Sequence, residues 1–310
     1  MSRAFVFPGQ GAQTIGMGKA LADAYPVARA VFDEVDDALG ERLSDLIWSG
    51  EAEDLTLTRN AQPALMATSM AAAKALESEG ISVDQTAFVA GHSLGEYSAL
   101  AAAGALSVAD AARLLRTRGR AMQEAVPVGV GAMAALLGLD LDAARQVAQD
   151  AAQGEVCEAA NDNDPAQVVV SGHKAAVERA VELARERGAK RAVMLPVSAP
   201  FHCALMAPAA EVMADALAKV DISAPVVPVV ANVTAAPVSD PDEIRKLLVE
   251  QVTGAVRWRE CVQTMAQAGV DDVWEIGAGK ALSGMIRRIE RSIATKAVGT
   301  PEDIRAVLAQ

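Results

Sequence analysis

The stretch TAFVAGHSLGEYSALAAA, residues 86–103, decides the fold of this 310-residue chain. Its first part, Thr86–Gly91, is a short apolar run that ends in glycine, which is typical of a strand buried in a sheet. A helical pattern from Leu94 to Ala103 follows with almost no loop between the two. A buried strand that turns directly into a helix is the repeating unit of a parallel sheet covered by helices. The sequence therefore predicts an α/β fold.

The turn between this strand and this helix reads Gly91-His92-Ser93-Leu94-Gly95, a G-x-S-x-G sequence. In a strand–turn–helix setting this sequence is typical of a nucleophile elbow, in which small neighbours permit a strained turn that exposes the serine hydroxyl. The alternative is a glycine-flanked serine in an ordinary turn, since roughly one chain in ten of this length contains the pattern by chance. The setting favours Ser93 as a nucleophile.

Strands and helices alternate on both sides of this unit. Before it we expect a strand at 3–7 and helices at 26–39, 43–49 and 61–79, and after it a helix from Ser107 to about Ala125. The last third predicts a helix at 204–219, a strand at 226–231, helices at 241–251 and 258–268, a strand at 271–275 and a helix at 280–291. This alternation predicts a mostly parallel sheet with helices on both faces.

A different pattern interrupts the alternation in the middle of the chain. It predicts strands at 131–139, 155–160, 167–171 and 190–196, with helices at 140–152 and 174–187. The order β-α-β-β-α-β is that of a ferredoxin-like unit. We therefore expect a ferredoxin-like subdomain at 129–197, inserted into an α/β body formed by 1–128 and 198–310.

Composition excludes several classes of function. The net charge of −12 repels phosphate backbones and anionic membrane surfaces, and only 3% of the residues are aromatic, so we expect no nucleic-acid partner. The three cysteines form no CxxC pair and no zinc pattern, which fits a reducing compartment. The N-terminal apolar run is too short for a signal peptide, and no apolar run reaches the length of a membrane span. We expect a soluble cytoplasmic protein.

A serine nucleophile needs a base, and the chain has three histidines. His92 leaves the elbow in another direction than Ser93, so packing is its expected role. His173 stands at the entry of a helix in the inserted unit, where capping is the simpler interpretation. His202 follows Pro200-Phe201, where the chain returns to the α/β body, and loops at such junctions often border a cleft. We expect His202 to be the general base.

No acidic residue stands out as a partner for His202. A backbone carbonyl can orient the imidazole instead, which suggests that water is not the intended acceptor of the acyl group. The glycine-rich loop Gly9-Gln10-Gly11 after the first strand matches neither a dinucleotide fingerprint nor a P-loop. An oxyanion donor is its more economical role: one N–H from this loop and one from Leu94.

The helix from Ser107 carries four arginines. Helical spacing places Arg113, Arg116 and Arg120 along neighbouring positions, which is typical of a solvated stripe. Arg118 lies about 160° away from Arg120 around the helix axis and need not belong to that stripe.

Seven short motifs occur in order along the chain: Phe7-Pro-Gly-Gln-Gly-Ala-Gln13, Gln62-Pro63-Ala64, Gly91-His-Ser-Leu-Gly-Glu96, Arg118-Gly-Arg-Ala-Met122, Asn161-Asp-Asn163, Pro200-Phe-His202 and Glu275-Ile-Gly-Ala-Gly-Lys280. This set resembles the malonyl-CoA:acyl carrier protein transacylases of bacterial fatty acid synthesis, a family shared with the acyltransferase domains of polyketide synthases. The resemblance covers essentially the whole chain. It implies a hydrolase-like α/β body with an inserted ferredoxin-like subdomain.

The resemblance also implies roles for individual residues. Ser93 resembles the acyl-accepting nucleophile and His202 its base, while Gln251 resembles the residue whose backbone carbonyl orients that base. The backbone N–H groups of Gln10 and Leu94 resemble the oxyanion hole.

Three further residues are expected to bind substrate: Arg118, Gln62 and Phe201. Arg118 resembles the arginine that pairs with the malonyl carboxylate. Phe201 resembles the malonyl-type rather than the methylmalonyl-type members, although fatty-acid members vary here. Ala278 and Ala12 depart from the usual proline and serine of their motifs, and neither touches the expected chemistry.

The implied reaction is a ping-pong transfer of malonyl from a CoA thioester to acyl carrier protein through a malonyl-serine, with no metal or bound cofactor. Three alternatives stay open: a serine hydrolase or thioesterase of the same fold, a non-catalytic scaffold that binds an acyl-carrier partner, and a malonyl-loading acyltransferase of a polyketide pathway. We expect a monomer.

Carrier proteins of this kind are acidic, as is this chain, so docking needs a local basic patch. The sequence offers Lys190-Arg191 and a second cluster of Lys280, Arg287, Arg288 and Arg291. The alternative is that these residues belong to ordinary solvated surfaces.

Overall fold

The computed structural model describes residues 2–309 and contains two sheets. The larger sheet has six strands in the order β10-β9-β1-β2-β7-β8. Their bounds are Arg3–Phe7 (β1), Phe88–Gly91 (β2), Val229–Val230 (β7), Pro237–Val238 (β8), Asp272–Ile276 (β9) and Ala294–Val298 (β10). All pairs from β10 to β7 are parallel, and the short edge strand β8 is antiparallel to β7. The predicted parallel sheet is confirmed.

Each face of this sheet has its own hydrophobic core, because successive side chains of a strand point to opposite faces. From β1, Phe5 and Phe7 join one core, and Ala4 and Val6 join the other. The helices that contribute to the first core include α2 (Pro26–Leu39), α5 (Thr58–Ser78), α6 (Gly95–Ala102), α7 (Val108–Glu124) and α10 (Ala207–Leu217); α12 (Trp258–Gln267) and α13 (Ala281–Ile289) contribute to the second. The remaining α-helices of the body are α1 (Lys19–Ala24), α3 (Leu43–Ser49), α4 (Ala52–Thr56), α11 (Pro241–Thr253) and α14 (Pro301–Leu308), and two short 3-10 helices are η1 (Val83–Gln85) and η2 (Ala204–Met206).

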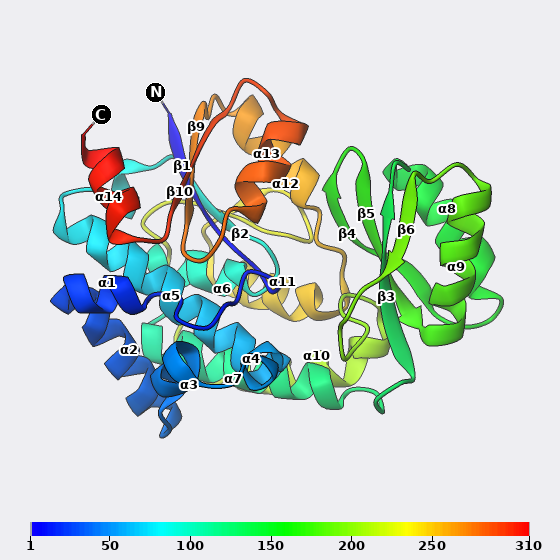
Figure 1. Cartoon of the computed structure of the whole chain (residues 1–310), viewed down its shortest axis with the longest axis horizontal. Helices are drawn as coiled ribbons and strands as arrows, with labels where there is room; N and C mark the ends of the chain where they lie inside the picture. Colours follow the sequence, from blue (N-terminus) through cyan, green and yellow to red (C-terminus); the bar gives the residue numbers. More distant parts are fainter. Residues whose placement is uncertain (1, 310) are drawn as a thin grey trace.

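The second sheet forms a subdomain at one end of the body, drawn in green in Figure 1. Its strands are β3 (Gly131–Leu137), β4 (Cys157–Asp164), β5 (Gln167–His173) and β6 (Arg191–Met194), and its helices are α8 (Leu141–Ala152) and α9 (Lys174–Glu186). The strands pair antiparallel in the order β4-β5-β3-β6, with the chain order that the sequence predicts for a ferredoxin-like unit.

The two faces of the second sheet serve different purposes. On β3, Ala132, Ala134 and Leu136 pack against α8 and α9 in a core of their own. Met133 and Ala135 alternate with them, face the body, and line a cavity between the subdomain and the body. The subdomain therefore supplies one wall of that cavity.

Strand β4 joins the subdomain to the body, and it runs four residues beyond the predicted end at 160. The N–H of Asp162 donates to the carbonyl of Val256 (2.9 Å), and the N–H of Val256 donates to the carbonyl of Ala160 (2.8 Å). The buried carboxylates of Asp162 and Asp164 pair with Arg259 on α12 and Arg288 on α13. Arg288 is therefore tied to the subdomain.

Helix α5 begins at Thr58, three residues earlier than predicted, and continues through Pro63. Pro63 has no N–H to donate, which would leave the carbonyl of Arg59 without its helical partner. The Nη1 atom of Arg116 on α7 donates to that carbonyl at 2.8 Å. Arg116 is thus partly buried and bonded, and its placement on a solvated stripe was wrong.

Other differences concern short elements. The sequence did not predict β8, β10, α1, α4 or α14, and the strand predicted at 226–231 is two residues long, Val229–Val230. Within residues 2–309, no helix has both the length and the apolar character needed to cross a bilayer.

Candidate active site

The turn from β2 into α6 is tight and strained at Ser93, whose φ is +53°. A Cβ at Gly91 would lie 1.9 Å from the carbonyl carbon of Gly95, and a Cβ at Gly95 would lie 2.2 Å from the carbonyl oxygen of Phe7. Both positions therefore require glycine, because neighbouring backbone atoms approach too closely to leave room for a Cβ. This is the physical reason for the two glycines of the G-x-S-x-G sequence.

Asn232 holds the elbow from the neighbouring segment after β7. Its Oδ1 accepts from the N–H of Ser93 (2.8 Å), and its Nδ2 donates to the carbonyl of Gly91 (2.7 Å). The side chain is fully buried. Sequence reasoning missed Asn232, because a single asparagine far from the elbow gives no signal.

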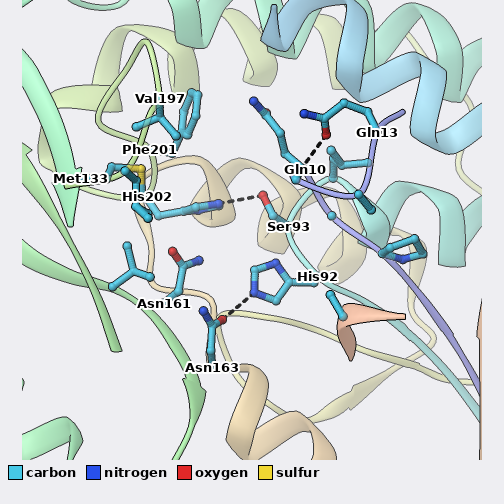
Figure 2. Close-up of a pocket in the computed structure, with 18 of the residues that line it drawn as sticks. Gln10, Gln13, His92, Ser93, Met133, Asn161, Asn163, Val197, Phe201 and His202 are labelled. Carbon is cyan, nitrogen blue, oxygen red and sulfur yellow. Dashed lines mark hydrogen bonds between the residues drawn. The ribbon is translucent and has the colours of Figure 1, made fainter. Parts of the chain in front are cut away.

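The hydroxyl of Ser93 meets the imidazole of His202, as Figure 2 shows. Oγ of Ser93 lies 2.7 Å from Nε2 of His202. On the other side of the ring, Nδ1 donates to the carbonyl oxygens of Gln251 (2.8 Å) and Gly254 (3.1 Å). Because Nδ1 carries the proton, the lone pair of Nε2 is free to accept the proton of Ser93. A carbonyl thus occupies the place that an acid takes in a hydrolase triad.

His202 is buried, and this burial together with the nearby Arg118 charge lowers its pKa to about 3. The imidazole is therefore neutral throughout the neutral pH range. A neutral imidazole is the form that can act as a general base.

Two backbone N–H groups remain free to bind an anion beside Ser93. Within residues 2–309, neither the N–H of Gln10 nor that of Leu94 donates a hydrogen bond to the protein. Both residues line the cavity. The Gln10 side chain is held by Thr58, whose Oγ1 donates to its Oε1 at 2.7 Å. The arrangement provides donors of the kind that an oxyanion hole needs.

Arg118 lines the same cavity and is 1% exposed. Its Nη1 donates to Oε1 of Gln62 (2.8 Å), and its Nη2 donates to Oε1 of Gln251 (2.9 Å) and reaches Oγ of Ser93 at 3.3 Å. Burial lowers the pKa of the guanidinium, and the nearby Tyr97 and Glu96 partly oppose that effect. The site therefore contains a fixed cation next to the hydroxyl of Ser93.

These groups open into a cavity of about 540 Å³. Its apolar lining includes Met122, Met133, Leu195, Val197 and Phe201, and its polar lining includes Gln62, Asn161, Asn163, Ser93, Arg118 and His202. The structure brings together every site residue named from the sequence except Gln251, which does not line the cavity but contacts three residues that do: Ser93, Arg118 and His202.

The other two histidines have structural partners. Nε2 of His92 is hydrogen-bonded to Oδ1 of Asn163 (2.8 Å), and its ring packs against Trp258. Nδ1 of His173 accepts from the N–H of Val156 in the subdomain. Among the described residues, no group of histidine, cysteine, aspartate and glutamate side chains is arranged to hold a metal ion.

Comparison with known proteins identifies relatives over the full length. The family model for the acyl transferase domain matches residues 4–298. The malonyl CoA-acyl carrier protein transacylase of Bacillus subtilis is 49% identical over 306 residues, which cover 98% of this chain and 96% of that protein. The solved acyl-carrier-protein-S-malonyltransferase of Bartonella henselae is 56% identical, with a TM-score of 0.97 over 100% of this chain and 99% of that one.

A third relative was solved with a partner. A malonyl-transacylase in complex with its type II PKS acyl-carrier protein is 42% identical, with a TM-score of 0.97 over 100% of this chain and 99% of that one. Together with the match to the acyl transferase model, these identities place the chain plainly: it belongs to the acyl transferase domain family, among the malonyl CoA-acyl carrier protein transacylases.

Proposed function

We propose that this protein is an acyl-carrier-protein S-malonyltransferase, which transfers malonyl from malonyl-CoA to the phosphopantetheine thiol of acyl carrier protein and supplies fatty acid synthesis. One observation carries the proposal. Oγ of Ser93 lies within 2.7 Å of a neutral imidazole and 3.3 Å of a buried guanidinium. A nucleophile, its base and a cation suited to a carboxylate thus converge on one atom.

In the first half-reaction, Oγ of Ser93 attacks the thioester carbonyl carbon while Nε2 of His202 takes the hydroxyl proton. The N–H groups of Gln10 and Leu94 stabilise the resulting oxyanion. The C–S bond then breaks, the proton on His202 passes to the CoA sulfur, and a malonyl ester remains on Ser93.

In the second half-reaction, the thiol of the carrier gives its proton to His202, and its sulfur attacks the ester carbonyl. The same two N–H groups stabilise the second oxyanion. The C–O bond of the ester breaks, and His202 returns the proton to Oγ of Ser93. The ester thus becomes a thioester on the carrier, and the enzyme returns to its starting state.

Arg118 selects the substrate, with Gln62 holding its guanidinium and Phe201 closing the apolar side of the cavity. A carboxylate that enters a buried site unpaired is costly, and the planar guanidinium pairs with both of its oxygens. Since a bound carboxylate fixes the acyl chain, the thioester carbon is held towards Ser93. A serine hydrolase has no need for this cation, which favours transfer over hydrolysis.

Mass spectrometry tests this function directly. The wild-type protein incubated with malonyl-CoA alone should gain one malonyl group, located on Ser93, and should release it to the carrier faster than to buffer. Ser93→Ala should not be loaded, and His202→Ala should lose both half-reactions strongly, because one imidazole serves each. Loading at another residue would contradict the mechanism, and release to water during turnover would identify a hydrolase.

The carrier docks on the basic cluster of Lys280, Arg287, Arg288 and Arg291, which lies in and beside α13. Ala281, Leu282 and Met285 of this helix line the cavity, so Lys280 lies close to its rim and Arg287 lies further along the same helix. Both are exposed. An acidic carrier bound there can direct its phosphopantetheine arm into the cavity.

The pathway served has a second candidate. The similarity to the transacylase solved with a type II PKS carrier favours a polyketide pathway as the alternative destination. Comparing kcat/KM for the fatty-acid carrier and for a polyketide carrier of the same organism separates the two.

The protein acts as a monomer, since one chain supplies every group of the site. Light scattering on the protein as it elutes from a size-exclusion column tests this.

A further inference from the structure

Glu96 is an ionisable residue of the site that the transfer mechanism does not use. It stands three residues after Ser93, in the first turn of α6, and is 3% exposed. Its Oε2 accepts from Nε2 of Gln251 (2.8 Å) and from the N–H of Asn232 (3.1 Å). Burying a carboxylate is costly unless it is hydrogen-bonded, so these two contacts fix both Glu96 and its partners.

The side-chain amide of Gln251 connects Glu96 to the reacting groups. Its Nε2 donates to Glu96 and to the carbonyl of Ser93 (3.0 Å). Its Oε1 accepts from Nη2 of Arg118 (2.9 Å). The backbone carbonyl of the same residue accepts from Nδ1 of His202 (2.8 Å). Gln251 therefore contacts the nucleophile, the base and the cation.

The two ends of this amide are chemically different, and only one orientation satisfies its neighbours. If the amide turned by 180°, its oxygen would face the Glu96 carboxylate and the Ser93 carbonyl, which are both acceptors. Its NH₂ group would face the Arg118 guanidinium, which has only donors. The Glu96 carboxylate thus selects the orientation in which Gln251 accepts from Arg118.

Three ionisable groups interact electrostatically with Glu96: Arg118 on α7, Tyr97 on α6 and Cys261 on α12. Burial raises the pKa of both Tyr97 and Cys261, so these two are neutral at neutral pH. Of the three, Arg118 is the charged one. Glu96 and Arg118 therefore form a carboxylate–amide–guanidinium chain through Gln251.

We propose that Glu96 is a positioning residue of the transfer reaction: its carboxylate locks the Gln251 amide, and this amide sets the Arg118 guanidinium beside Ser93 to receive the substrate carboxylate. The inference rests on the proposed function, which assigns Arg118 to the malonyl group. Glu96 itself touches neither substrate nor the reacting atoms.

The hydrogen bond from the Gln251 amide to Glu96 weakens when Glu96 takes up a proton. Burial raises the pKa of Glu96 to about 7, against the opposing hydrogen bonds from Asn232 and Gln251 and the charge of Arg118. The ionised form is a strong acceptor, whereas the protonated form carries an O–H donor that competes with the Gln251 amide. Malonyl transfer should therefore rise with pH as Glu96 ionises around pH 7.

The experiment compares malonyl-CoA with acetyl-CoA, because acetyl has no carboxylate for Arg118 to bind. Glu96→Gln keeps the size of the side chain and an acceptor oxygen but removes the charge. We expect kcat/KM for malonyl-CoA to fall at least about tenfold, as for loss of a charged hydrogen-bond partner. The loss for acetyl-CoA should be much smaller, and the limb of the malonyl pH profile near pH 7 should disappear.

A matched control is Asp36→Asn, which neutralises another buried carboxylate outside the cavity. Asp36 accepts from the N–H and Oγ of Ser44 at the start of α3. This variant should lower stability without changing the ratio of malonyl to acetyl transfer.

A double-mutant cycle separates positioning through Arg118 from a general effect on the fold. In an Arg118→Ala background, Glu96→Gln should change the malonyl-to-acetyl ratio no further. The inference would be overturned if Glu96→Gln lowered kcat/KM equally for malonyl-CoA and acetyl-CoA. It would also be overturned if Glu96→Gln changed the malonyl-to-acetyl ratio in the Arg118→Ala background as much as it does in the wild type. Failure of wild-type Ser93 to load malonyl would overturn the proposed function instead, so the two failures are distinguishable.

Discussion

Ser93 and His202 share a backbone feature: both have a positive φ, of 53° and 57°. A non-glycine residue in this region costs about 1–3 kcal/mol and persists only where its surroundings fix it. At Ser93 the fixing contacts are visible, since Asn232 accepts from its N–H and Gln251 donates to its carbonyl. With both residues in this conformation, Oγ of Ser93 lies 2.7 Å from Nε2 of His202.

At the same scale, Arg118 is expected to decide between substrates. Arg118→Ala should lower kcat/KM for malonyl-CoA at least about a hundredfold, since a buried ionic group without its partner costs about 3–5 kcal/mol. Acetyl-CoA should be affected far less, and Arg118→Lys should stay poor because it restores charge without the planar fork. Steady-state kinetics with both thioesters measure this. Equal losses for the two substrates would show that Arg118 is structural.

The low pKa of His202 has a consequence for stability. The group binds its proton more weakly in the folded state, with a pKa of about 3 against an ordinary 6.5. Between these values the unfolded chain binds the proton and the folded chain does not, so stability falls as pH falls. Between pH 7 and pH 5 the wild type should lose about 2 kcal/mol more than His202→Gln.

Urea unfolding of both proteins at the two pH values measures the difference. His92 and Glu96 titrate in both proteins and cancel in the comparison. A difference between the proteins that does not change with pH would show that the pKa of His202 is the same in the folded and unfolded states, and would contradict the prediction.

At the scale of elements, the elbow depends on how closely α6 approaches β1. Gly95→Ala would bring a Cβ to 2.2 Å from the carbonyl oxygen of Phe7, which belongs to a central strand and cannot retreat. The helix must then move, and Ser93 with it. We expect a lower Tm and a strong loss of kcat, measured by thermal unfolding and malonyl loading.

Gly284→Ala provides the control for this substitution. Gly284 lies in α13, where a Cβ would meet only Nη1 of Arg288 at 3.7 Å. Alanine is favoured over glycine in a helix by about 0.5–1 kcal/mol, so this variant should keep its Tm or raise it. A Gly95→Ala protein as stable and active as Gly284→Ala would contradict the packing argument.

At the scale of the whole molecule, two sheets meet around one cavity. The subdomain contributes Met133 and Ala135, and the body contributes the elbow and Arg118. The bonds of Asp162 and Asp164 to α12 and α13 hold the two parts together. We propose that the boundaries lie at 128/129 and 197/198, just outside β3 and β6.

From the charge of the molecule we expect docking of the carrier to be sensitive to salt. A chain with a net charge of −12 repels an acidic partner except at a basic patch. KM for the carrier should therefore rise with ionic strength, while KM for malonyl-CoA changes little. Arg287→Glu should raise KM for the carrier without changing KM for malonyl-CoA. Lys74→Glu, which reverses the charge of an exposed residue on α5, should leave KM for the carrier unchanged. Equal salt responses for both substrates would contradict electrostatic docking.

The sequence by itself determined the order of the main strands and helices, because buried runs, capping residues and glycines act over a few neighbouring positions. It also located Ser93, since a G-x-S-x-G turn is local and its glycines are required by local contacts. Helical spacing separated Arg118 from the other arginines of its helix, but its role came from the resemblance to known transacylases. The resemblance also added Gln251, whose isolated position carries no local signal.

Only the tertiary structure decided how these residues act together. Asn232 and Glu96 hold the elbow and the Gln251 amide through contacts between segments far apart in the chain. Helix α5 runs through Pro63 because Arg116, more than fifty residues away, bonds the carbonyl that proline leaves free. Such hydrogen bonds depend on distances across the fold, and no pattern of neighbouring residues records them.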